Sequence, residues 1–301
     1  MRKITTGVLT GILGSLAACS VNPVTERSQL SLVPENFVIA RSYSSYANMM
    51  GGQFSSGKLN TNKEQTDRIR DIAFKIIPHA IDHKPEIINW KWEVNLINED
   101  EVNAFCMAGG KIAVYSGLIT KLHPTDDELA QVIAHEIAHA LSGHTQEKMS
   151  VALAGGLIGN VILAASARRG TQLDANTVDV LLKVVWGLPN SRQAETEADR
   201  IGIKLAAMAG YNPKASASLW QKMRLQEKSI RISLLNTHPH PEDREEDMRM
   251  ESYKLENIYS KAIEKIQNGT QRKIEYENGN PVGLYGKSKY EEPRSTAEAL
   301  K

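Results

Sequence analysis

The chain has 301 residues, of which 41% are hydrophobic and 24% charged, and its formal net charge is +1 at pH 7. This length suffices for one large domain or two small ones, and the composition is ordinary for a folded globular protein. The small net charge and the lack of a basic run interleaved with aromatic residues predict no nucleic-acid partner.

The N-terminus resembles the signal of a bacterial lipoprotein. Two basic residues precede an apolar stretch, residues 4–16, that is too short to span a bilayer comfortably. Small residues then lead to Cys19, and in proteins with this pattern the signal is cut before the cysteine, which carries the lipid. We therefore expect residues 1–18 to be a lipoprotein signal peptide and Cys19 to be lipidated, with an ordinary signal peptide as the alternative. Ser20 in place of Asp is typical of sorting to the outer membrane, so we expect a lipid-anchored protein on the periplasmic face of that membrane.

The remaining chain divides by composition into three parts. Residues 19–35 are polar with two prolines and predict a lipidated tether. Residues 36–267 carry the periodic patterns of one folded domain, and residues 268–301 are polar and predict a partly disordered tail. Residues 151–167 are strongly apolar, but they are few and contain glycines and an Asn. A buried or membrane-facing helix is therefore favoured over a second span.

Four elements are expected before the centre of the domain. Residues 36–50 look helical, and the capping-box pattern Thr61–Glu64 predicts a second helix that ends before Pro78. Residues 90–97 alternate and are rich in strand-forming types, which predicts a strand. A glycine pair then marks a turn, and residues 111–115 predict another short strand.

The central helix carries the sequence His135-Glu136-Ile137-Ala138-His139, which has the H-E-x-x-H pattern of helical zinc sites. On a helix, His135 and His139 lie on one face and can reach one metal ion, while Glu136 flanks the metal. Thr125 predicts the N-cap of this helix, with Glu128 completing a capping box. A core helix with two chance histidines is the alternative interpretation.

A catalytic zinc site needs a third protein ligand. Position 145 is Thr, which excludes the H-E-x-x-H-x-x-G-x-x-H class, and a continued helix would place His144 opposite His135. A packing or capping role is expected for His144. Glu195 and Asp199 share a face of a later helix that begins near Ser191 and ends at Gly210, so that Glu195 could ligate and Asp199 could accept the free N–H of a ligand histidine. Glu197 points elsewhere, and a solvated acidic face is the alternative for Glu195.

The combined motifs resemble the gluzincins of metallopeptidase family 48, in particular its lipoprotein-type members. They follow the family's order over about residues 60–250: Asn103-Ala104-Phe105 with Gly109-Gly110, the H-E-x-x-H helix, Glu195-x-x-Ala198-Asp199, and Thr237-His238-Pro239 with Arg244. Ala108 departs from the Pro that is frequent there, which leaves the geometry of the turn open. The resemblance implies a mainly α, zincin-like metallopeptidase fold with a small β-sheet and one Zn²⁺ per chain.

The resemblance also implies a zinc endopeptidase of the bacterial envelope that cleaves misfolded or misassembled polypeptides. Glu136 would act as general base towards a zinc-activated water. His238 lies on a loop stiffened by prolines and would reach the site as an oxyanion donor or as an inhibitory latch, with a surface turn as the alternative. Arg244 would fix that loop or add charge stabilisation.

Substrate contacts are expected near the strand that precedes the metal helix, because an extended peptide can add to a strand by backbone hydrogen bonds. The candidate residues are Asn103, Gly110, Lys111, Ile112 and Ala113. A structural hairpin without substrate contact is the alternative.

Two other classes of function stay open. One is an envelope assembly factor or chaperone that uses the zinc fold as a latent or non-catalytic binding module, and the other is a different zinc hydrolase. The complete ligand set with Glu136 favours catalysis, since a binding module needs no general base. With Cys19 lipidated, Cys106 is left without an intramolecular disulfide partner, and we expect it to be a small buried residue.

Overall fold

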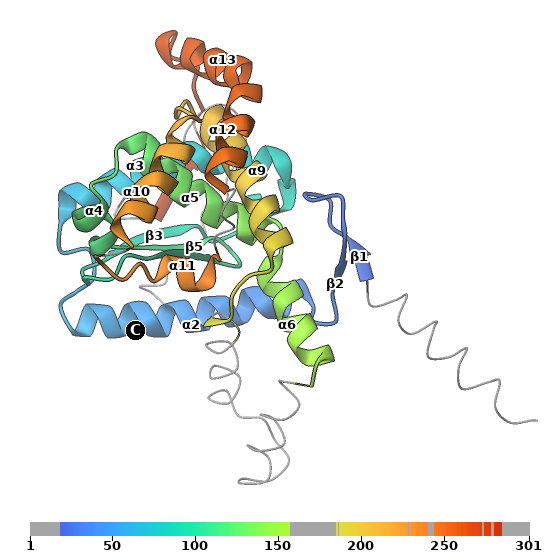
Figure 1. The fold of residues 1–301 in the computed structure, drawn as a ribbon. Helices are drawn as coiled ribbons and strands as arrows, with labels where there is room; N and C mark the ends of the chain where they lie inside the picture. Colours follow the sequence, from blue (N-terminus) through green and yellow to red (C-terminus); the bar gives the residue numbers. More distant parts are fainter. Residues whose placement is uncertain are drawn as a thin grey trace, which may run out of the picture.

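The structure is a computed structural model that describes residues 19–156, 185, 187–227, 229–239, 244–272, 274–277 and 280–284. The signal peptide expected at residues 1–18 and most of the apolar segment 151–167 lie outside these ranges. Within them, no helix combines the length and the apolar character needed to cross a membrane. The fold is mostly helical with small sheets, as the sequence predicts (Figure 1).

The central sheet has three strands in the order β3-β5-β4. Strand β3 (Glu93–Ile97) runs parallel to β5 (Lys111–Tyr115), and β4 (Ala104–Met107) is antiparallel to β5. Strand β5 is therefore paired on both sides, whereas β4 forms an edge of this sheet.

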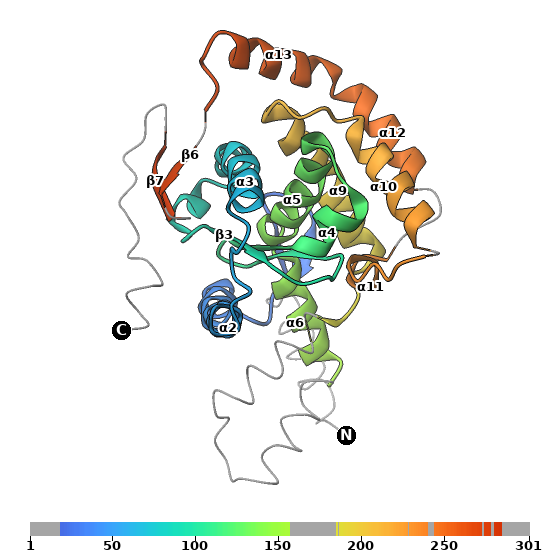
Figure 2. The ribbon, with the colours of Figure 1, turned by 90° about the vertical axis from the view of Figure 1, so that its left-hand side faces the viewer.

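Helices cover both faces of the sheet. Helices α3 (Lys63–His83) and α5 (Asp126–Leu141) lie on one face and α2 (Glu35–Ser55) crosses the other (Figures 1 and 2). Successive side chains of β5 point to opposite faces of the sheet, so the strand packs against the helices on both sides. Ile112 and Val114 belong to the core cluster with α3 and α5, while Ala113 packs with the α2 residues Tyr46 and Met50.

The other helices follow these layers along the chain. They are η1 (Pro85–Asn89), α4 (Ser116–Leu122), α6 (His144–Ala154), α9 (Arg192–Met208), α10 (Ala215–Gln226), α11 (Leu234–Thr237), α12 (Arg244–Lys254) and α13 (Glu256–Gln267). A second hairpin, β6 (Ile274–Glu277) with β7 (Asn280–Leu284), lies beside α3 (Figure 2). Part of the tail expected at 268–301 is thus ordered in strands.

Two predicted boundaries are wrong. Asn62, and not Thr61, caps α3 by accepting a hydrogen bond from the backbone N–H of Gln65. The helix then continues through Pro78 to His83. Proline normally ends a helix because it lacks an N–H and crowds the preceding turn. Here the turn after Pro78 is buried in the core, and this tertiary packing offsets the loss.

The predicted strand at 90–97 is shorter than expected. The backbone N–H of Trp90 still donates to the carbonyl of Ile87 in the turn of η1, and the strand begins only at Glu93. In contrast, the start of α5 and both ends of α9 agree with the sequence. Thr125 and Glu128 form both bonds of the capping box.

The region expected to be a tether has structure of its own. Strand β1 (Cys19–Val21) pairs with β2 (Ser28–Leu30) in an antiparallel hairpin, and the chain then enters α2 at Glu35. Figure 1 shows this hairpin beside α6 and α9. The residues expected to form a tether thus contain a hairpin that contacts distant parts of the chain.

Candidate metal centre

Helix α5 presents the two predicted ligand histidines to helix α9, which packs closely against it. A Cβ atom at Gly202 of α9 would lie 2.9 Å from the backbone N and Cα of His135. Only glycine permits this approach. Because Glu195 lies two turns before Gly202 on the same helix face, the close packing brings its carboxylate to the histidines.

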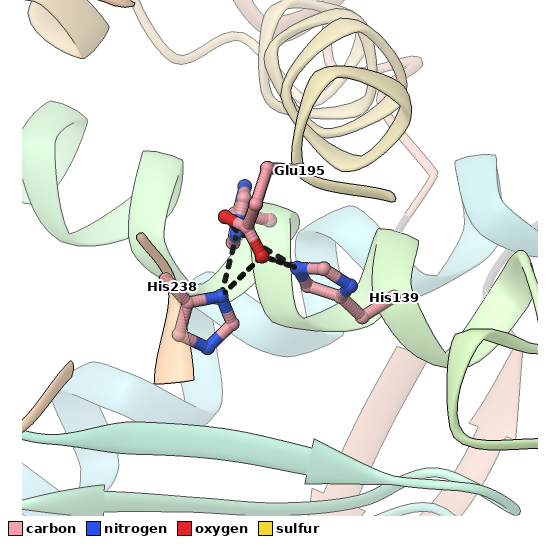
Figure 3. Close-up of side chains that lie close together, drawn as sticks. His139, Glu195 and His238 are labelled. Carbon is pink, nitrogen blue, oxygen red and sulfur yellow. Dashed lines mark hydrogen bonds and ion pairs between the residues drawn. The ribbon is translucent and has the colours of Figure 1, made fainter. Parts of the chain in front are cut away.

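Four side chains converge on one point. His135 Nε2 lies 3.0 Å from His139 Nε2, and Glu195 lies 3.4 Å from the first atom and 3.2 Å from the second. His238 Nδ1 lies 3.0 Å from Glu195 Oε1 and 3.3 Å from His135 Nε2. The four potential ligand atoms all lie within 4.8 Å of one another (Figure 3). The structure therefore joins α5, α9 and the loop after α11 at this cluster.

The spacing and the donor types fit zinc. Zinc bonds of about 2.0–2.2 Å to imidazole nitrogen and carboxylate oxygen place neighbouring ligand atoms roughly 3.4 Å apart in a tetrahedron. In addition, Glu195 Oε2 is buried and accepts no hydrogen bond of good geometry from any residue that the structure describes, although Arg244 Nη1 lies 3.0 Å away. A buried carboxylate oxygen in this state is satisfied by a bound cation.

The two ligand histidines differ in protonation. Burial lowers the pKa of His139, which keeps this imidazole neutral and able to ligate. Burial would also lower the pKa of His135, but the carboxylates of Asp199 and Glu195 outweigh it and raise that pKa to about 9. Burial works against the ionisation of Glu195, yet the surrounding histidines hold its pKa far below the ordinary value. A metal ion would displace one proton from His135.

Glu136 lies beside the cluster and is not one of its four members. Its side chain is buried, and its Oε1 atom is 3.5 Å from His238 Nε2 with no hydrogen-bond partner among the described residues. Burial raises the pKa of Glu136 above its ordinary value. A carboxylate with a raised pKa is a better proton acceptor near neutral pH. This placement agrees with a general base at Glu136.

Asp199 and Arg244 lie behind His135. Asp199 Oδ1 is 3.0 Å from His135 Nδ1, so the imidazole can donate its Nδ1 proton and keep Nε2 for a metal. Arg244 donates two hydrogen bonds to the same carboxylate, from Nε at 2.7 Å and from Nη2 at 2.6 Å. The guanidinium also stacks 3.9 Å from the ring centre of Trp220 on α10. Asp199 is thereby fixed in place.

His144 does not occupy the position that the sequence indicates. Helix α5 ends at Leu141, and a turn through Gly143, with φ +63°, redirects the chain into α6. His144 is consequently not opposite His135 on one helix. Its Nδ1 lies 2.7 Å from His139 Nδ1, and its Nε2 lies 3.1 Å from Glu197 Oε2. His144 is buried, as a packing role implies, and it contacts a ligand histidine directly.

A cavity of about 310 Å³ opens beside the cluster. Its walls include Glu136 and His139 of α5, His238, and the edge strand β4 with the preceding Asn103. This is the space in which a substrate could reach the metal.

The predicted substrate strand is wrong. Lys111, Ile112 and Ala113 lie on β5, which is paired on both sides, so no peptide can add to it. Lys111 is 2% exposed and its ammonium binds Glu93 and the carbonyl of Lys91.

Gly110 forms the turn before β5, where a Cβ atom would lie 2.6 Å from the Trp92 ring. It therefore shapes the hairpin and does not reach the cavity. Asn103 alone among the predicted substrate residues lines the cavity.

The sequence did not single out β4 as a strand, and yet β4 is the edge that faces the cavity. The Tyr115 N–H donates to the Asn103 carbonyl at 3.0 Å. Since residues alternate in an antiparallel ladder, the backbone groups of Ala104 and Cys106 point away from β5. The Ala104 N–H accordingly donates to the side-chain Oδ1 of Asn103 at 2.9 Å instead of to β5. Cys106 is a free, buried thiol, and burial raises its pKa.

Taken together, the helix-borne histidines, the glutamate from a second helix and the flanking Glu136 define the class of zinc metallopeptidases. Residues 63–252 match the model of Peptidase family M48. The chain belongs to this family.

Several curated proteins are similar to this chain. Mitochondrial metalloendopeptidase OMA1 of Saccharomyces cerevisiae is 32% identical over 208 residues, covering 65% of this chain and 58% of the relative. The beta-barrel assembly-enhancing protease of Escherichia coli K12 is 31% identical over 194 residues, covering 61% and 38%. The protein of the same name from Yersinia pestis is 27% identical over 242 residues, covering 68% and 49%. The chain thus spans about half the length of these relatives.

Proposed function

We propose that this protein is a zinc-dependent endopeptidase of the bacterial envelope that cleaves misfolded or misassembled proteins. One observation carries the proposal. The buried ligand set of His135, His139 and Glu195, with Glu136 beside it, borders a cavity that is also lined by β4, the strand at the edge of the three-stranded sheet. The ligand set supports metal-assisted hydrolysis, and the strand edge supports a polypeptide substrate.

The chemistry follows from the positions of the side chains. His135, His139 and Glu195 would hold the zinc ion, which supplies a Lewis acid and lowers the pKa of a coordinated water. Glu136 would accept the proton of the attacking water and later deliver it to the leaving amine. Asp199, itself held by Arg244, would keep the proton of His135 on Nδ1.

The substrate would bind as an extended strand along β4. The outward backbone groups of Ala104 and Cys106 offer donors and acceptors for antiparallel pairing. In the absence of a peptide, the Ala104 N–H donates a hydrogen bond to Asn103 Oδ1. A substrate carbonyl would replace Asn103 Oδ1 as the acceptor. Recognition through the backbone suits unfolded chains, because it needs an extended segment and few particular side chains.

His238 gives the enzyme a resting state. Its Nδ1 joins the ligand cluster and its Nε2 faces Glu136, so one imidazole could serve as a further metal ligand and at the same time lie against the base. We propose that this arrangement is inhibitory and that the loop carrying His238 must move before a peptide is cut. A latent protease would spare envelope proteins that are still folding.

The envelope location rests on the lipoprotein-like pattern that ends at Cys19 and on the similarity to the bacterial beta-barrel assembly-enhancing proteases. The similarity to mitochondrial OMA1 points to a different compartment. A lipid on Cys19 separates the two, since that modification belongs to bacterial lipoproteins.

The test is cleavage of an unfolded protein such as casein by purified protein. We expect cleavage that stops with a chelator and returns with zinc. Glu136→Gln should keep its zinc and lose about 10²–10⁴-fold in rate, because the base is lost and no ligand is. Glu195→Ala should lose both zinc and activity. Zinc-loaded protein that never cleaves would favour the non-catalytic assembly factor. A Glu136→Gln variant as active as the wild type would show that Glu136 is not the general base.

A further inference from the structure

The ring of the ligand histidine His139 has a partner on the side facing away from the metal centre. Its Nε2 points into the cluster, 3.2 Å from Glu195 Oε1. Its Nδ1 points the other way and lies 2.7 Å from His144 Nδ1. His144 Nε2 lies 3.1 Å from Glu197 Oε2. A line of three side chains thus runs outward from the metal position.

The protons of this line can be placed from the chemistry. A ligand histidine binds through a nitrogen lone pair, so His139 must carry its proton on Nδ1 when Nε2 ligates. His144 Nδ1 must then accept the hydrogen bond from His139, which leaves the one N–H proton of the neutral His144 ring on Nε2, from which it donates to Glu197. With both rings neutral, this is the one arrangement that gives each close pair a single proton.

The line ends at the N-terminal hairpin. Arg27 lies between β1 and β2, and its Nε and Nη2 bind the two oxygens of Glu197 at 2.6 and 3.1 Å. Its Nη1 and Nη2 also bind Glu147 of α6 at 2.6 and 2.8 Å. Charge-assisted bonds in this paired geometry are strong and directional. Arg27 therefore fixes the carboxylate that orients His144.

The same hairpin holds the turn from which His144 emerges. Asn22 and Gln29 both donate side-chain hydrogen bonds to the carbonyl of Ser142, at 2.8 and 3.0 Å. Ser142 is the C-cap of α5, and Gly143 follows it in a left-handed conformation. The hairpin thus caps the end of the metal helix and fixes the start of α6.

We propose that His144 is a positioning residue for the metal ligand His139, and that the N-terminal hairpin of residues 19–30 holds His144 in place through Arg27 and Glu197. This inference rests on the proposed function, since it takes the cluster to be a metal site. It gives the hairpin a role in metal retention, although no residue of the hairpin belongs to the cluster.

The experiment measures zinc affinity of the purified full chain by competition with a chelator. His144→Ala should weaken zinc binding about 10–100-fold, the usual effect of removing the partner of a ligand histidine. His144→Asn should recover part of the loss, because its amide can accept from His139 and donate to Glu197. Glu197→Gln keeps the shape of the side chain. The single variants Glu197→Gln and Arg27→Gln should each weaken zinc binding by less than His144→Ala does.

Glu147→Gln is the matched control. It removes the other carboxylate partner of Arg27 and leaves the line to His139 in place, so its zinc affinity should stay within about twofold of the wild type. The absorption spectrum of the cobalt-substituted protein gives a second readout, and it should shift for His144→Ala and not for Glu147→Gln, because only the first change alters ligand geometry.

Equal zinc affinities and equal cobalt spectra for His144→Ala, Arg27→Gln and the wild type would overturn this inference and leave the proposed function standing. A wild-type protein that binds no zinc would refute the proposed function itself, and the inference with it. If His144→Ala fails to fold, the comparison of Glu197→Gln with Glu147→Gln decides, with equal affinities counting against the inference.

Discussion

His238 lies where water and substrate would have to bind. Its Nδ1 is 3.0 Å from Glu195 Oε1, and its Nε2 is 3.5 Å from Glu136 Oε1. Replacing it tests whether it is a latch or an oxyanion donor. We expect His238→Ala to raise the basal rate of casein cleavage, with zinc retained by His135, His139 and Glu195. Rates are to be normalised to zinc content, so that a loss of metal is not mistaken for a loss of chemistry.

A fall in the rate of casein cleavage for His238→Ala would instead identify His238 as an oxyanion donor. An imidazole that mainly donates to the oxyanion contributes about 10²–10³-fold to the rate. His238→Ala would then be slower by that factor while still loaded with zinc. An unchanged rate and an unchanged zinc affinity would remove His238 from the mechanism.

His135 makes zinc binding depend on pH. Burial opposes its charge, but Asp199 and Glu195 raise its pKa to about 9, so below that pH a proton occupies the nitrogen that the metal needs. Zinc must displace this proton. We therefore expect the apparent zinc affinity to rise about tenfold per pH unit up to about pH 9 and to level off above it. Titrations against a chelator of known proton affinity between pH 6.5 and 10 measure this slope.

The matched variant for this pH dependence is Asp199→Asn. Without the negative charge, the pKa of His135 should fall, and the steep part of the curve should move to lower pH. A wild-type curve that is flat from pH 7 to 9 would show that His135 carries no competing proton.

Strand β4 is the element that should decide how a peptide binds. The Ala104 N–H points away from β5, so a proline there removes one outward donor and no ladder bond. We expect Ala104→Pro to raise the KM for a peptide substrate by up to about tenfold, the value of one hydrogen bond, with a smaller change in kcat. Steady-state kinetics on a short peptide measure both.

Phe105→Pro is the control on the same strand. Its N–H points towards β5, so the substitution breaks the sheet and should lower the melting temperature. If Ala104→Pro leaves KM unchanged while the protein stays folded, the peptide does not pair with β4 at that position.

The start of helix α5 and the end of helix α9 could be predicted from sequence because caps are local. Thr125 with Glu128 begins α5, and Gly210, with φ +87°, follows the end of α9. Strand β4 was missed since four residues carry too little periodic signal. The continuation of α3 past Pro78 was missed because the gain comes from burial in the core, which local patterns do not contain.

At the scale of the whole molecule, the site depends on packing between distant segments. The ligand types and their helical spacing were visible in the sequence, and so were Asp199 and Arg244 as companions. The role of His144 was not visible, because it depends on the chain turning at Gly143 and on Arg27, which is 170 residues from its partner Glu197. Contacts between residues so far apart in the chain do not affect the local hydrophobic periodicity from which helices and strands are predicted.

The hairpin that begins at Cys19 joins the metal centre to the expected membrane anchor, so the anchor is the last feature to test. The Cys19 thiol is exposed and free, whereas Cys106 is buried. We expect Cys19→Ala to abolish lipidation, seen as a lower intact mass, and to move the protein from the membrane pellet to the soluble fraction. Cys106→Ala, which removes the other thiol, should leave both unchanged. Cys19→Ala protein that still pellets after a high-salt wash would instead indicate that residues 151–167 hold the protein to the membrane.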